Sequence, residues 1–136
     1  MSTPVWILSE TIVALHEQLL SSFGGASGLR DKDALRAVLT APEQAFAADR
    51  ASVFSLAATY CRSLLSQRPF ADGNLILAFA TAALFLELNG YRLRASEADA
   101  AIRTLAFAAE AMDETDYAGW LLANARRIET PGAKKP

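Results

Sequence analysis

The sequence predicts an all-α fold, a compact bundle of about six helices around one buried central helix. Ala and Leu, both strong helix formers, occur 28 and 19 times among the 136 residues. Apolar residues recur at helical spacing along most of the chain, and no alternating strand of convincing length interrupts them. With 52% hydrophobic residues, a single domain of this length can bury a substantial core.

The first two helices are predicted on either side of a glycine-rich loop. Ser9 is a good N-cap for the first, which should end near Gly24-Gly25. Asp31 is placed to cap the second, and Pro42 should end it. The predicted apolar face of the first helix consists of Ile12, Leu15, His16 and Leu19.

The next two helices flank a break in the apolar periodicity. Residues Ala51–Gln67 form the predicted third helix, and Arg68–Gly73 must be a loop. Asn74–Leu88 is apolar on nearly all sides, so this fourth helix should be central and buried. Asn89-Gly90 is a strong C-terminal stop.

The last part of the chain predicts two further helices. Ser96 opens a variant of the capping box, so a fifth helix should run to about residue 111 and a last one over Asp116–Arg127. Val5–Leu8 and Tyr91–Leu93 could each be short extended pieces, pairing at most as a minor ribbon. The expected organisation is an extended segment at 1–8, one domain at 9–128 and a flexible tail at 129–136.

Composition narrows the class of protein. The net charge of −2 disfavours a long disordered chain and direct binding to nucleic acid. A single cysteine, Cys61, and a single histidine, His16, exclude disulfide frameworks and multi-histidine metal sites. No signal peptide is visible, and the longest uncharged run, residues 73–86, is shorter than the roughly 20 residues of a membrane span. We therefore expect a cytoplasmic protein that does not contact membranes.

The segment Arg68-Pro69-Phe70-Ala71-Asp72-Gly73-Asn74 is the best candidate for chemistry. Gly73 permits a sharp turn directly before the central helix, whose free N–H groups would then suit a phosphate or another anion. Asp72 could hold Mg²⁺ beside that phosphate, Pro69 would stiffen the loop, and Phe70 would pin it to the core. The simpler interpretation is a turn followed by an N-cap, because Asp-Gly turns are common.

This loop resembles the signature of the Fic/Doc (Fido) superfamily, HxFx(D/E)GN, and most closely its death-on-curing (Doc) branch, HPFxDGNKR. The similarity extends over roughly residues 12–122. Further matching segments are Leu15-His16, Gly24-Gly25, Gly28-Leu29-Arg30-Asp31, Pro42, residues 85–91 and Trp120-Leu121.

The resemblance implies a Fido-type helical bundle and an ATP- and Mg²⁺-dependent transfer to a protein hydroxyl. Most family members move AMP. The Doc type is a toxin kinase that phosphorylates a translation factor and is paired with a small antitoxin. The implied partners are an antitoxin-like protein or a related Fic/Doc subunit, and the implied phosphate-binding residues are Asp72, Gly73 and Asn74.

Three positions depart from the family pattern. The family histidine, which is the general base, is replaced by Arg68, and a guanidinium stays protonated near neutral pH. The phosphate-binding Lys and Arg are replaced by Leu75 and Ile76, which cannot neutralise a phosphate. The sequence therefore predicts a pseudoenzyme that binds a nucleotide, another anion or a partner protein.

Two other functional interpretations stay open. One is an active phosphotransferase or AMP-transferase with a rebuilt site, and the other is a purely structural interaction module. Arg68 itself either holds an anion over Gly73-Asn74 or only caps the third helix, where the helix dipole favours a cation.

The remaining polar candidates have structural interpretations. We expect His16 to be hydrogen-bonded inside the bundle, Cys61 to be a buried inert thiol, and Asp31 to be a helix cap. Glu87 should pair with Arg92 or Arg94.

Overall fold

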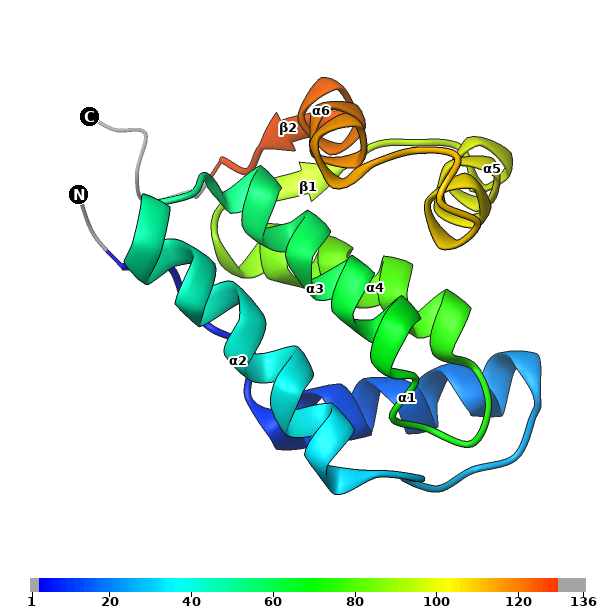
Figure 1. The fold of residues 1–136 in the computed structure, drawn as a ribbon. Coiled ribbons are helices and arrows are strands. Elements are labelled where there is room, and N and C mark those ends of the chain that lie inside the picture. The colour runs from blue at the N-terminus through cyan, green and yellow to red at the C-terminus, as the bar shows by residue number, and fades with distance from the viewer. Residues whose placement is uncertain (1–2, 130–136) are drawn as a thin grey trace.

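The computed structural model describes residues 3–129 and confirms the all-α prediction (Figure 1). Six helices and one short two-stranded ribbon make up this part of the chain. The elements are α1 (Ser9–Phe23), α2 (Lys32–Asp49), α3 (Val53–Gln67), α4 (Asn74–Leu88), β1 (Tyr91–Leu93), α5 (Glu97–Ala108), α6 (Glu114–Ala123) and β2 (Ala125–Arg127).

The α3–α4 hairpin is the centre of the bundle. The two helices run side by side and antiparallel, so that the loop 68–73 lies at one end and the β1–β2 ribbon at the other (Figure 1). Helix α2 packs against α3, α1 contacts α4, and α5 and α6 cover the remaining side of α3 and α4. The predicted bounds of α4 are correct. Helix α4 is surrounded by other elements, so it does not need a polar face toward solvent.

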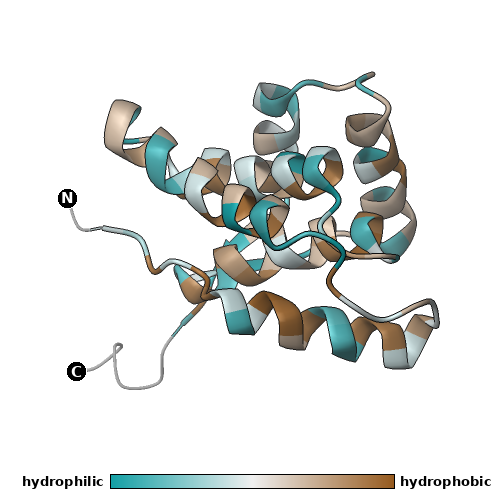
Figure 2. Cartoon of the chain, turned by 60° about the horizontal axis from the view of Figure 1, so that its bottom comes forward, coloured by the Kyte–Doolittle hydropathy of each residue, from teal (hydrophilic) through white to brown (hydrophobic). Residues whose placement is uncertain are grey.

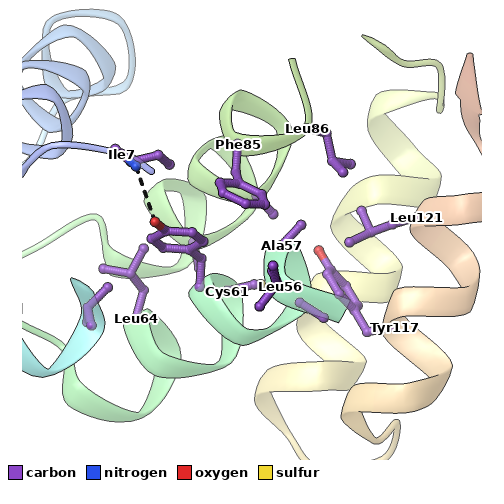
Figure 3. Close-up of a cluster of buried hydrophobic side chains, with 14 of the residues drawn as sticks. Ile7, Leu56, Ala57, Cys61, Leu64, Phe85, Leu86, Tyr117 and Leu121 are labelled. Atoms are coloured by element: carbon purple, nitrogen blue, oxygen red, sulfur yellow. Dashed lines mark hydrogen bonds between the residues drawn. The ribbon is translucent and has the colours of Figure 1, made fainter. Parts of the chain in front are cut away.

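The core joins all of these elements. Tyr60 of α3 is fully buried beside Phe85 of α4, with ring centroids 4.9 Å apart, and its hydroxyl accepts a hydrogen bond from the Ile7 backbone at 3.2 Å. Figure 3 shows Ile7, Cys61 and Phe85 in this cluster. Cys61 is also fully buried, as predicted, and burial raises the pKa of its thiol to about 12. The thiol is therefore protonated and unreactive at neutral pH.

Most helix starts follow their predicted caps. Asp31 accepts hydrogen bonds from the N–H groups of Asp33 and Ala34, and Ser96 accepts one from Asp99. The prediction for Ser9 is wrong by one position, because Leu8 is the N-cap and makes no side-chain bond. Helix α1 shows alternating apolar and polar bands along its length (Figure 2). Its apolar residues Ile12, Leu15 and Leu19 lie in the core or pack against it.

Pro42 does not end the second helix, contrary to the prediction. Helix α2 continues to Asp49 and stops at Arg50, which adopts the left-handed conformation. Proline inside a helix costs about 3 kcal/mol through its missing N–H and a steric clash. Here Pro42 is buried and, one turn later, Phe46 is buried in the core, and the burial of these two side chains offsets that cost.

The C-terminal elements also differ from the prediction. Helix α5 ends at Ala108 rather than near 111, and α6 spans 114–123 rather than 116–127. The segment 125–127 pairs with β1 as an antiparallel strand, whereas the residues around Val5 bond to the Asn89 side chain instead of a strand. The predicted tail at 129–136 lies outside the described residues except for position 129. None of the described helices is long and apolar enough to cross a bilayer.

Candidate functional site

The loop between α3 and α4 is held in place by the glycine-rich segment that precedes α2. The N–H groups of Arg30 and Asp31 donate to the Pro69 carbonyl at 2.7 and 3.1 Å, and the Ala71 N–H donates to the Gly28 carbonyl at 3.1 Å. These backbone contacts fix two segments about 40 positions apart in the sequence against each other. These bonds therefore hold the start of the loop in one position.

Phe70 anchors the loop from below, as the sequence predicts. Its ring is 2% exposed and stacks on the His16 ring, with 3.9 Å between centroids and 17° between planes. The Asn74 side chain holds the same residue from the other side, accepting from the Phe70 N–H at 3.2 Å and donating to its carbonyl at 2.9 Å. The amide of Asn74 is thus used within the loop, and what it can offer to a ligand is its backbone N–H.

His16 lies directly under the loop. Its Nε2 is 2.8 Å from the Asp72 carbonyl oxygen, so that this nitrogen is the donor and carries the proton. The side chain is 1% exposed. The structural role predicted for His16 is confirmed, and its buried ring tethers α1 to the loop.

Gly73 is the N-cap of α4 and has φ +79°. A Cβ added there would lie in ordinary contact with His16 Nε2 (3.5 Å) and a Leu20 methyl group (3.4 Å), so it is the positive φ that favours glycine. Within the described chain no side chain caps the start of α4. The first N–H groups of the helix, from Asn74 to Ile76, therefore have no partner within the helix, and they carry the positive end of the helix dipole.

The Asp72 carboxylate stands at the edge of this helix start. One oxygen accepts from the Gly73 N–H at 2.9 Å, and the other accepts from the Ala26 N–H at 3.3 Å. A Cβ on Gly25 would come within 2.9 Å of the carboxylate, so the glycine-rich segment approaches it closely. Among residues 3–129 no three metal-ligating side chains come together, and Asp72 could bind Mg²⁺ only together with phosphate oxygens.

Arg68 is the last residue before the loop turns. It is the C-cap of α3 with φ 47°, and its side chain is exposed with no polar partner in the described part of the chain. The cation that binds the end of α3 is Arg30, whose guanidinium donates to the carbonyls of Gln67 and Arg68. The sequence analysis did not predict this role of Arg30. The available signal was its position between the glycine-rich segment and the helix cap Asp31.

Leu75 and Ile76, in the first turn of α4, line an apolar groove. The groove has a volume of about 470 Å³ and lies between α1, α4 and α5. Its lining consists of Leu19, Phe23, Leu75, Ile76, Phe79, Ala80, Glu97, Ala100, Ala101, Thr104 and Leu105. Phe23 and Leu105 are 69% and 53% exposed, so large apolar side chains are left open to solvent beside the loop.

Together these features set out which groups the loop could present to a ligand. The first backbone N–H groups of α4 and the Asp72 carboxylate at their edge form what we call the anion cradle, and Arg68, at the other end of the loop, has an exposed side chain. A proton acceptor aimed at a bound hydroxyl would have to be Asp72, whose two oxygens already accept N–H groups. The neighbouring groove is suited to an apolar surface rather than to a phosphate.

Two comparisons with known proteins find sequences similar to this chain. The model of the Fic/DOC family matches residues 6–86, which span α1 to α4 and include the whole loop. The protein kinase doc of Escherichia phage P1 is 30% identical over 88 residues, which cover 64% of this chain and 70% of that protein.

Proposed function

Since the chain belongs to the Fic/DOC family, we propose that it is a cytoplasmic Doc-like protein of toxin–antitoxin type whose ATP-dependent transfer to a protein hydroxyl is lost or strongly reduced. In this proposal the loop 68–74 keeps the ability to bind a nucleotide phosphate or another anion. The protein then acts by binding a partner rather than by turnover.

The observation that carries the proposal is the position of Arg68. It is the C-cap of α3 and the first residue of the loop, at the position where the family signature has its general base. A guanidinium holds its proton at any physiological pH, so it can attract an anion but cannot accept the proton of an attacking hydroxyl. General base catalysis typically contributes 10²–10⁴-fold, and this contribution is lost.

The surroundings offer no second imidazole to replace the base. His16 is the single histidine of the chain, and it is buried with Nε2 committed to the Asp72 carbonyl. The apolar side chains of Leu75 and Ile76 remove a further contribution, because phosphoryl transfer depends mainly on positioning and charge stabilisation. A residual anion site is supported by the uncapped N–H groups of α4 and by Arg68.

Titration of the purified protein with ATP and Mg²⁺ by calorimetry tests this function. We expect weak binding that depends on Mg²⁺, and no label transferred to protein from ATP labelled at the α- or γ-phosphate. Asp72→Asn should weaken the Mg²⁺-dependent part, because it removes the carboxylate at the cradle. Asp33→Asn, which changes an exposed carboxylate on α2, is the control and should bind as the wild type does.

Two results would replace the proposal with its alternatives. Labelled protein at rates typical of an enzyme would establish an active transferase with a rebuilt site, and the labelled phosphate would distinguish phosphotransfer from AMP transfer. A flat titration at millimolar ATP would favour a structural interaction module without a ligand at the loop.

The apolar groove supports the partner side of the proposal. Exposed apolar patches of this kind mark protein contacts in soluble proteins, and this one begins at the first turn of α4. An amphipathic segment of an antitoxin-like protein, or of a related Fic/Doc subunit, would cover Phe23, Leu75 and Leu105. By resemblance to the Doc type, the protein that an active subunit modifies would be a translation factor.

Copurification with a coexpressed antitoxin-like protein tests the groove. We expect Leu105→Glu to abolish the complex, because it places a carboxylate in the apolar contact. Leu122→Glu is the matched control, since Leu122 is similarly exposed (58%) on α6 and does not line the groove. The same result for both variants, whether the complex is lost or kept, would contradict docking in the groove.

A further inference from the structure

The β1–β2 ribbon carries a concentration of positive charge that the proposed function does not use. Four of the chain's 13 cationic residues fall on the seven residues Tyr91–Arg94 and Ala125–Arg127. In the antiparallel register Arg92 lies directly opposite Arg126, and Arg94 directly follows the last residue of β1, with its N–H bonded to the Asn124 carbonyl at 2.7 Å. Because side chains alternate between the faces of a strand, these three arginines share the outer face. We call Arg92, Arg94 and Arg126 the arginine face.

The other face of the ribbon explains why this one points outward. Tyr91 and Leu93 are partly buried against the core, and the Tyr91 ring meets Phe54 of α3 at 4.9 Å. Arg127 lies on that inner side, where it donates to the Tyr91 hydroxyl at 2.9 Å. The arginine face is therefore fixed by packing, and its three members are exposed.

The fold itself neutralises little of this charge. Arg92 pairs with Glu87 at 3.3 Å, as the sequence predicted, with both side chains about half exposed. Arg126 bonds only to the carbonyl of its neighbour Ala125, and Arg94 has no ion pair within residues 3–129. Like charges directly opposite each other on two paired strands are destabilising, so the pair of Arg92 and Arg126 reduces the stability of the ribbon. Such a conflict is expected where a surface serves binding.

We propose that the arginine face binds a short acidic segment of a partner protein. The face spans about 7 Å along the strand and about 5 Å across it, which is room for two or three carboxylates. Guanidinium groups bind carboxylates in a bidentate manner, which gives direction as well as attraction. Without the four ribbon arginines, nine cationic residues stand against 15 acidic ones, so a long polyanion such as duplex DNA would be repelled beyond this face.

This surface is separate from the candidate site. The ribbon and the loop 68–73 lie at opposite ends of the α3–α4 hairpin (Figure 1). The 15 residues of α4 separate them by about 22 Å. A change on the arginine face therefore leaves the loop and its groove intact, and the two proposals can fail independently.

Fluorescence anisotropy of the whole chain with fluorescein-labelled hexaglutamate tests the proposal. We expect binding at low salt that weakens as salt is added, and a loss of at least ~10-fold in the variant R92Q/R94Q/R126Q. The control R36Q/R50Q/R103Q removes the same charge from three exposed arginines elsewhere and should lose less than ~2-fold. Arg94→Gln alone, outside the direct cross-strand pair, provides a second variant should the triple change disturb the ribbon.

Three outcomes would overturn the proposal. They are no anisotropy change with hexaglutamate, equal losses in the ribbon and control variants, and tighter binding of a 20-base-pair DNA duplex than of hexaglutamate through the same arginines. The last outcome would identify the surface as a nucleic-acid site instead.

Discussion

The triple substitution R68H/L75K/I76R is expected to raise transfer of labelled phosphate from ATP to protein by at least ~100-fold over the wild type. The imidazole restores a group that can accept a proton near neutral pH, which is typically worth 10²–10⁴-fold. The two cations restore charge stabilisation at the start of α4, where phosphoryl transfer depends on it most. The measurement is label incorporated in a cell extract, together with growth arrest on expression.

The scaffold should tolerate these changes. Position 68 has a left-handed backbone, a region in which histidine is enriched over most residues. Leu75 is 39% exposed, and the long stems of Lys and Arg can cover the apolar wall while their charges reach solvent. The control R68Q/L75K/I76R carries the same new cations without a base. Activity in this control equal to that of the histidine variant would show that the missing base is not what limits the protein.

The fold could be predicted from the sequence wherever local signals and burial agree. Both ends of helix α4 were predicted correctly, because its apolar run is bounded by Gly73 and by Asn89-Gly90, residues that favour a helix boundary. Pro42 misled the prediction because local geometry argues for a stop, while the burial of Phe46 is a tertiary effect that local rules do not see. The pairing of 91–93 with 125–127 was missed for a related reason, since a three-residue strand carries almost no periodicity.

The candidate site shows a similar division. The sequence predicted the loop, the turn at Gly73 and the anchoring ring of Phe70, because each follows from one residue and its neighbours. The contacts that fix the loop come from distant segments and could not be predicted, among them the carbonyls bound by Arg30 and the Asp72 carbonyl bound by His16. The apolar groove was also missed, because it exists only where α1, α4 and α5 meet.

Phe70→Ala is expected to reduce the free energy of unfolding by about 3–5 kcal/mol, the usual range for removing a buried phenylalanine ring. The ring is 2% exposed and stacks on His16, so its loss leaves a cavity between α1 and the loop. The bonds from Asn74 to the Phe70 backbone persist in the variant, so the change reports on the ring alone. Chemical denaturation of both proteins gives the difference directly.

Phe23→Ala is the matched control, because the same ring is removed from a side chain that is 69% exposed at the rim of the groove. Its cost should stay within about 0.5 kcal/mol, as for most surface substitutions. A loss below about 1 kcal/mol for Phe70→Ala would mean that the ring does not hold the loop. In that case the backbone contacts of Pro69 and Ala71 with the glycine-rich segment would be what keeps the anion cradle in place.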